Sequence, residues 1–119
     1  MATNLIAIID DDRAWTDPAA LALRDDGFDV RVASDGVQAL DLLATIRPML
    51  VILDVHLPRM NGLHVLREFR RQDPITPVLM VSSDDQASLE DRAMADGACG
   101  FLHKPIPLDF LLRAVRRLD

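Results

Sequence analysis

The chain has 119 residues, of which 19 are acidic and 13 are basic, so its formal charge is −6. This length is typical of one domain with a single core, and the acidic balance without a basic run argues against a nucleic-acid binder. No apolar stretch approaches the roughly 20 residues of a transmembrane helix, no secretory signal is visible, and the single cysteine cannot form an internal disulfide, so we expect a cytoplasmic protein without membrane contact.

Short apolar runs alternate along the chain with helix-compatible stretches. Strands are predicted over residues 4–9, 28–33, 49–53, 78–82 and 99–102. Helices are predicted over residues 36–46, 62–71, 86–96 and 108–118, and an earlier helix ends near residue 24. This alternation is typical of βαβ units, in which helices connect parallel strands. We therefore expect a single α/β doubly wound domain over residues 1–119, with helices on both faces of a five-stranded parallel sheet.

The start of the first helix has two interpretations. Asp17 and Pro18 make a good N-cap and first-turn pair, which favours a start near residue 17. The alternative is a start near residue 13, in which case Pro18 removes an early hydrogen bond of the helix. The choice decides where Trp15 points; we expect it near the acidic residues described below, with simple packing in the core or at its rim as the alternative.

The residue patterns of two predicted strands indicate which of their side chains are buried. Phe28, Val30 and Val32 alternate with polar residues, which predicts an edge strand with one solvated face. Cys99 lies in an apolar setting before Gly100, which predicts a buried structural thiol.

Four of the predicted strands end in polar residues of different kinds. They are Asp10, Asp11 and Asp12 after the first strand, Asp54 after the third, Ser82 at the end of the fourth and Lys104 after the fifth. Because the carboxyl ends of parallel strands share one edge of the sheet, where open α/β sheets bind ligands, we expect these groups to converge. Lys104 is also the only lysine, since the other 12 of the 13 basic residues are arginines.

Such a set of residues suits phosphoryl-transfer chemistry. Clustered carboxylates raise one another's pKa values unless a cation compensates, and hard oxygen ligands suit Mg²⁺. A carboxylate beside that ion can act as a nucleophile and form an aspartyl phosphate. The ammonium of Lys104 and the hydroxyl of Ser82 could then neutralise or hydrogen-bond the remaining phosphoryl oxygens.

The chain resembles the receiver domain of two-component response regulators, the family that includes the chemotaxis response regulator. The resemblance spans the whole chain and rests on four motifs, Ile9-Asp10-Asp11-Asp12, Leu53-Asp54-Val55-His56-Leu57-Pro58-Arg59-Met60-Asn61-Gly62, Val81-Ser82-Ser83 and Phe101-Leu102-His103-Lys104-Pro105. It implies a flavodoxin-like strand order 2-1-3-4-5.

The resemblance also assigns roles around a magnesium ion. Asp54 would be the phosphoacceptor and a metal ligand. Asp11 would bind Mg²⁺ directly, Asp10 would bind it through water, and the backbone carbonyl of His56 would complete the protein ligands. His56 and Asp84 occupy the two positions that tune dephosphorylation in this family.

The same resemblance implies a switch. Ser82 would move toward the phosphoryl group, Lys104 would pair with it, and Phe101 would turn inward in response. Lys104-Pro105 is expected to be a cis peptide. The chain departs from the family pattern in carrying Ser82 where threonine is usual and Phe101 where many members have tyrosine.

Partners and alternatives follow from these roles. We expect a sensor histidine kinase or a phosphotransfer protein as phosphodonor, and a downstream protein that reads the surface formed by residues 86–96, 99–102 and 108–118. The chain would then be a signalling phosphoacceptor, not an enzyme, with no effector domain after its last helix. The alternative is a receiver-like interaction module that works without phosphorylation. A small hydrolase is disfavoured, because Val55 and His56 follow Asp54 where an aspartate-based phosphatase usually has a second acid.

Overall fold

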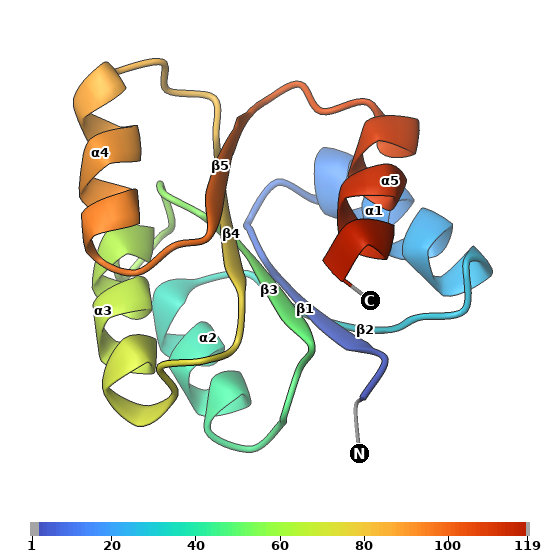
Figure 1. Ribbon diagram of the computed structural model, residues 1–119, viewed down its shortest axis with the longest axis horizontal. Coiled ribbons are helices and arrows are strands. Elements are labelled where there is room, and N and C mark those ends of the chain that lie inside the picture. The colour runs from blue at the N-terminus through green and yellow to red at the C-terminus, as the bar shows by residue number, and fades with distance from the viewer. Residues whose placement is uncertain (1–2, 119) are drawn as a thin grey trace.

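The computed structural model describes residues 3–118 and consists of five strands that alternate with five helices (Figure 1). The strands are β1 (Leu5–Ile9), β2 (Asp29–Ala33), β3 (Leu50–Asp54), β4 (Val78–Ser82) and β5 (Gly100–His103). The helices are α1 (Arg13–Asp25), α2 (Gly36–Leu43), α3 (Gly62–Gln72), α4 (Ala87–Ala95) and α5 (Leu108–Leu118). Within residues 3–118, no helix combines the length and the apolar composition that a membrane span requires.

All five strands are parallel and lie in the order β2-β1-β3-β4-β5. In the centre of the sheet, Ile8 of β1 lies opposite Val32 on one side and Ile52 on the other. The parallel direction places all five carboxyl ends at one edge of the sheet. The α/β doubly wound fold and its strand order are therefore confirmed.

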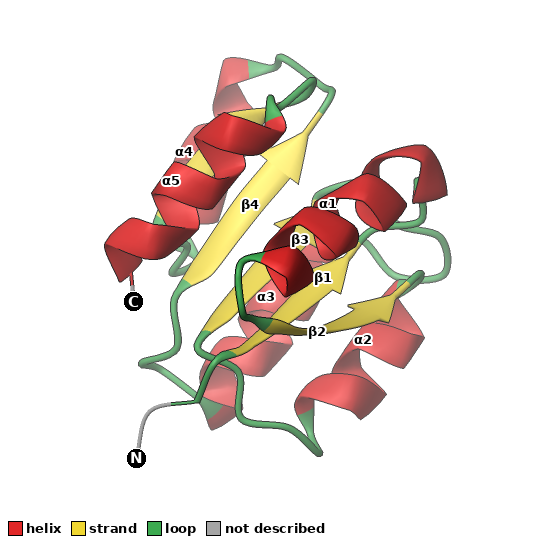
Figure 2. Ribbon diagram, turned by 90° about the vertical axis from the view of Figure 1, so that its right-hand side faces the viewer, coloured by secondary structure: helices red, strands yellow, loops and turns green. Residues whose placement is uncertain are grey.

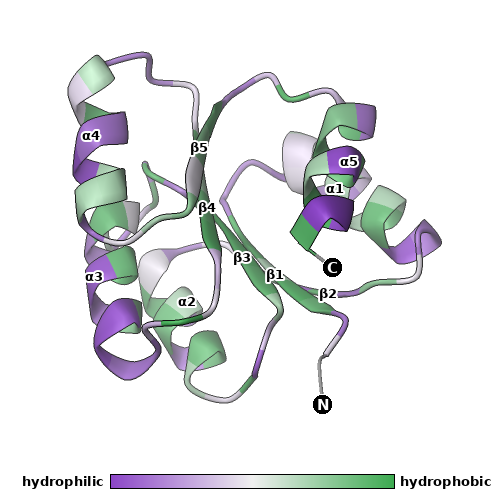
Figure 3. Ribbon diagram, viewed as in Figure 1, coloured by the Kyte–Doolittle hydropathy of each residue, from purple (hydrophilic) through white to green (hydrophobic). Residues whose placement is uncertain are grey.

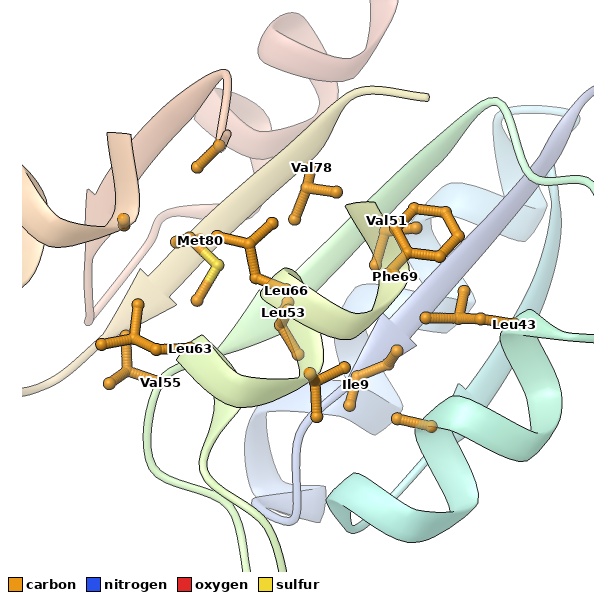
Figure 4. Packing of buried hydrophobic residues seen from close by; sticks show 14 of the residues in the cluster. Ile9, Leu43, Val51, Leu53, Val55, Leu63, Leu66, Phe69, Val78 and Met80 are labelled. Atoms are coloured by element: carbon orange, nitrogen blue, oxygen red, sulfur yellow. The ribbon is translucent and has the colours of Figure 1, made fainter. Parts of the chain in front are cut away.

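Alternate strand residues face two separate apolar layers. One layer packs beneath α2, α3 and α4 and includes Ile9, Leu53 and Met80 (Figure 4). The other lies beneath α1 and α5 and includes Ile8 and Ile52; Figure 2 shows these two helices in front of the sheet. Burial on both faces explains why the central strands are continuously apolar, as the hydropathy colouring of Figure 3 shows. Each fully buried aliphatic side chain contributes roughly 1.5–3 kcal/mol.

Helix α1 begins at Arg13, so the preferred start near residue 17 was wrong and the alternative is correct. Asp12 is the N-cap, and its carboxylate accepts a hydrogen bond from Ala14 N at 3.2 Å. Pro18 lies inside the helix, close enough to the start that only one early hydrogen bond is lost. Asp17 instead forms an exposed pair with Arg13, one helical turn earlier, at 3.7 Å.

The prediction of an edge strand is confirmed, because β2 is an outermost strand of the sheet and Phe28 and Val30 are buried. Val32 departs from the alternation, since it is 45 % exposed. The predicted burial of Cys99 was wrong. Cys99 is exposed, although its neighbour Ala98 is buried. Both residues belong to or adjoin an outermost strand, where a sheet neighbour on one side is missing and cover by helices is less complete.

Candidate functional site

The carboxyl edge of the sheet brings together residues that are far apart in sequence. Asp10 directly follows β1, Asp54 is the last residue of β3, and Lys104 directly follows β5. Asp10 is 1 % and Asp54 is 6 % exposed, so both carboxyl groups are withdrawn from water. Lys104 reaches them with a side chain that is 12 % exposed.

The ammonium of Lys104 contacts both buried carboxylates. Its Nζ lies 2.5 Å from Oδ2 of Asp10 and 3.4 Å from Oδ2 of Asp54. The other oxygen of each carboxylate accepts a backbone hydrogen bond, from Asp12 N to Asp10 Oδ1 at 2.9 Å and from His56 N to Asp54 Oδ1 at 3.2 Å. Both carboxylates are therefore held in fixed orientations by one cation and by the loops that follow their strands.

Three carboxylates at this edge are close enough to share a cation. One oxygen each from Asp10, Asp11 and Asp54 lies within 4.8 Å of the others. Asp11 is exposed, so one side of the cluster is open to solvent. An all-carboxylate donor set with an open side fits Mg²⁺, which prefers oxygen ligands and keeps several waters.

The electrostatics of the site follow from this crowding. Burial, followed by the charge of Asp10, raises the pKa of Asp54 from 3.8 to about 6, even though Lys104 opposes the shift. Burial disfavours the charged form of Lys104, but its contacts with Asp10 and Asp54 outweigh that effect and raise its pKa. The ammonium therefore stays charged, and the Asp54 carboxylate has an excess of negative charge around it that a further cation would relieve.

The mouth of the site is an open cavity of about 430 Å³. It is lined by Asp11, Asp12, Trp15, Asp54, His56, Ser83, Lys104 and Pro105. His56 and Asp84 bridge across the loops that follow β3 and β4, with 3.0 Å between His56 Nε2 and Asp84 Oδ2. Hydrogen bonds from Gln86 N and from His56 lower the pKa of Asp84.

The remaining predicted residues lie next to this cavity. Ser82 is fully buried at the end of β4, and its hydroxyl accepts a hydrogen bond from Asp84 N at 3.0 Å. Phe101 is half-buried on β5, with its ring centroid 5.1 Å from that of His103. The Lys104-Pro105 peptide is cis, as the resemblance implied.

The loop between β3 and α3 is pressed against the strand that carries Asp54. An ideal Cβ at Gly62 would lie 1.9 Å from the backbone oxygen of Asp54, so no side chain fits there. Asn61 caps α3 through a 2.8 Å hydrogen bond from Leu63 N. This glycine lets the helix begin immediately behind the carboxylate.

The sequence left the role of Asp12 open and predicted Trp15 near the acidic residues. The prediction for Trp15 is confirmed, because it lines the mouth of the site together with Asp11 and Asp54. Asp12 is the N-cap of α1, which its position just before a helix start at residue 13 would have indicated. Trp15 places its ring under the ammonium of Lys104, with 5.3 Å between Nζ and the ring centroid. No local pattern indicates that contact, because Trp15 and Lys104 are 89 residues apart in the sequence.

Comparisons with known proteins agree on one family. Residues 6–116 match the family model of the response regulator receiver domain. The response regulator MprA of Mycobacterium sp. (strain KMS) is 40 % identical over 113 residues, which are 95 % of this chain and 49 % of that protein. The chain thus spans about half the length of the curated relatives it matches.

Solved structures show the same similarity. A CheY-like response regulator receiver domain protein from Methanospirillum hungatei JF-1 has a TM-score of 0.94 at 25 % identity, covering 99 % of this chain and 95 % of that one. A Burkholderia pseudomallei response regulator with a phosphorylated aspartic acid, calcium ion and citrate has a TM-score of 0.86 at 25 % identity, covering 92 % and 65 %. The family match across nearly the whole chain, together with the acidic cluster and lysine at the carboxyl edge of a 2-1-3-4-5 sheet, shows that the chain belongs to the response regulator receiver domain family of two-component signalling.

Proposed function

We propose that this chain accepts a phosphoryl group on Asp54 from the phosphohistidine of a sensor histidine kinase or a phosphotransfer protein. The observation that carries the proposal is the Asp54 carboxylate itself, which is buried, held by His56 N and placed 3.4 Å from the only lysine of the chain. A carboxylate oxygen of Asp54 would attack phosphorus as the bond from phosphorus to the histidine nitrogen breaks, and the histidine ring leaves. The relative with a phosphorylated aspartic acid supports this chemistry.

Mg²⁺ would be held by Asp11, Asp54 and the backbone carbonyl of His56, with Asp10 acting through a water molecule. When bound, the ion would supply positive charge to the phosphoryl oxygens. The protein's own contribution is then Lys104. Its ammonium already contacts Asp54 and needs only a small shift to meet a phosphoryl oxygen in the place of the carboxylate.

Ser82 would transmit the phosphorylation of Asp54 from the site to the surface of the domain. Its hydroxyl accepts the Asp84 N–H at 3.0 Å, and it would turn toward a phosphoryl group to donate its own proton. That movement would open space beside β4, which Phe101 of β5 would fill by turning inward. The surface of α4, β5 and α5 would then be read by a downstream protein. His56 and Asp84, which pair across the mouth of the site, would set the lifetime of the aspartyl phosphate by controlling the access of water.

The proposed phosphodonor also indicates where in the cell the chain acts and which reactions it carries out. Sensor kinases act on partners in the cytoplasm, so we place the chain there. Its covalent chemistry would be limited to its own phosphorylation and dephosphorylation, as in a signalling phosphoacceptor, with residues 1–119 forming the receiver unit.

Phosphorylation by a small-molecule donor tests the proposal. The wild type, incubated with acetyl phosphate or phosphoramidate and Mg²⁺, should gain the mass of one phosphoryl group, and Asp54→Asn should gain none. Asp41→Asn, which changes an exposed aspartate on α2, is the matched control and should be labelled like the wild type. A wild type that stays unmodified with Mg²⁺ present would favour an interaction module that works without phosphorylation.

A further inference from the structure

We propose that Trp15 is a positioning residue for Lys104. The indole ring of Trp15 holds the Lys104 ammonium in position beside Asp54 for phosphoryl transfer. This role rests on the proposed function of Asp54 as phosphoacceptor. The basis is the contact between the two side chains, which belong to opposite ends of the chain and meet only at the carboxyl edge of the sheet.

The geometry is that of a cation–π contact. Lys104 Nζ lies over the Trp15 ring at 5.3 Å from its centroid, within the roughly 6 Å over which such contacts are significant. Trp is the most favourable aromatic partner, and the half-buried setting limits screening by water. The ammonium therefore has three contacts, namely the carboxylates of Asp10 and Asp54 and the face of this ring.

The placement of Trp15 depends on its ring rather than on its N–H group. Its Nε1 is buried, yet it makes no hydrogen bond with any group in residues 3–118. A buried indole N–H usually finds an acceptor, so leaving it unpaired has a cost that other contacts must offset. The contacts that Trp15 does make are with the apolar layer beneath α1 and α5 and with the ammonium.

A neutral ring does something that a third carboxylate could not do. Lysine has a flexible four-carbon stem, and aiming its ammonium costs conformational entropy. Another carboxylate would hold the ammonium but would neutralise the charge that the phosphoryl oxygens need. The ring attracts the ammonium through its quadrupole and adds no net charge. The first turn of α1, capped by Asp12, anchors the ring.

The composition of the chain allows an unusually direct test. Trp15 is the only tryptophan and Lys104 is the only lysine. Biosynthetic incorporation of mono-, di- and trifluorotryptophan therefore alters the ring at position 15 alone, and each fluorine weakens the quadrupole with little change in shape. Lysine labelled with ¹³C and ¹⁵N gives the side-chain resonances of Lys104 alone. Urea unfolding of each protein monitors stability.

Two results are expected. The Lys104 side-chain resonances of the unphosphorylated protein should move stepwise with the number of fluorines. The rate of phosphorylation by acetyl phosphate with Mg²⁺ should fall stepwise by a total of about 2-fold to 30-fold, the range that corresponds to the loss of one cation–π contact. Trp15→Phe should keep part of the rate, whereas Trp15→Leu, which keeps apolar volume without a ring, should match the most fluorinated protein.

The outcomes separate this proposal from the one on which it rests. Phosphorylation rates that stay flat across the series, or that follow unfolding stability instead of fluorine number, would overturn the role of Trp15 while leaving Asp54 as phosphoacceptor. If the Lys104 side-chain resonances do not shift with the number of fluorines on Trp15, the contact between the two side chains is refuted. If the resonances move but no protein in the series is phosphorylated, the proposed function fails and the role of Trp15 in transfer fails with it.

Discussion

The ammonium of Lys104 lies 2.5 Å from Oδ2 of Asp10, a carboxylate that is only 1 % exposed. Asp54 stands 3.4 Å from the same nitrogen, so one cation serves two buried carboxylates. Removing one partner of a buried ion pair leaves the other uncompensated, which is far more costly than losing a surface pair.

We therefore predict that Lys104→Met destabilises the fold. With EDTA present at pH 7.5, the free energy of unfolding should fall by about 3–5 kcal/mol in urea titrations, the range for a broken buried pair. The loss should shrink at pH 5, where the raised pKa of Asp54 lets that carboxyl take up a proton. The control is Arg67→Met, which breaks the exposed 3.1 Å pair with Asp96 and should change stability by less than about 1 kcal/mol. Equal losses in the two variants would contradict the prediction.

The raised pKa of Asp54 predicts a pH dependence of stability. The pKa of Asp54 in the folded state is about 6 against 3.8 for an ordinary aspartate, so the folded state binds the proton more tightly than the unfolded state. The stabilisation from this residue is fully present below pH 3.8 and is lost as the pH rises through 6. In the absence of Mg²⁺, the free energy of unfolding of the wild type relative to Asp54→Asn should therefore fall by about 1–2 kcal/mol between pH 4.5 and 7.5. Urea titrations of both proteins across this interval measure the difference, and parallel pH profiles would show that Asp54 is not perturbed.

Mg²⁺ should raise the melting temperature of the wild type, because it relieves the repulsion among Asp10, Asp11 and Asp54. At a concentration 100 times the dissociation constant, the stabilisation is about 2.7 kcal/mol. Asp11→Asn should lose most of this response. Asp12→Asn removes the neighbouring charge and keeps a good N-cap, so it should respond like the wild type. Thermal denaturation with and without Mg²⁺ measures both, and a normal response in Asp11→Asn would exclude that residue as a ligand.

Gly62→Ala should disrupt the site through the backbone. The new Cβ would lie 1.9 Å from the backbone oxygen of Asp54, so either α3 or the end of β3 must move. We expect a loss of about 3 kcal/mol or more in unfolding free energy, at the upper end of overpacking effects, together with slower phosphorylation.

Gly27→Ala provides a matched glycine elsewhere in the fold. Its Cβ would meet nothing within 4 Å, but its φ of +96° disfavours any side chain. Gly27→Ala should lower the free energy of unfolding by about 1–2 kcal/mol and leave the rate of phosphorylation unchanged. If Gly62→Ala lowers the free energy of unfolding by no more than Gly27→Ala does, the backbone around Asp54 must move easily to make room for the new Cβ.

The elements themselves could be predicted because their signals are local. Runs such as Val51-Ile52-Leu53 are buried on both faces and leave no alternation to interpret, and α5 carries apolar residues at helical spacing. The errors occurred where neighbours decide burial. Val32 continues an alternating apolar pattern and Cys99 has an apolar setting in sequence, but they lie at the two outer edges of the sheet, where less of the protein covers them.

The start of α1 shows a different kind of limit. Asp17 and Pro18 satisfy the local rules for a helix start, and Asp12 satisfies the rule for an N-cap equally well. The loop after Asp10 is tied down by the hydrogen bond from Asp12 N to Asp10 Oδ1. That contact favours the earlier start, and the helix accepts Pro18 within its early turns.

The pattern of residues along the chain predicts the alternating α/β fold and the convergence of Asp10, Asp11, Asp54 and Lys104, because parallel strands must end at the same edge. Which of these groups are in contact follows from the packing of the folded chain: Lys104 lies nearer to Asp10 than to Asp54, and Trp15 lies beneath its ammonium. These contacts depend on distances between the ends of different strands and on the start of α1. Such distances arise from packing across the whole sheet, and no local pattern of residues encodes them.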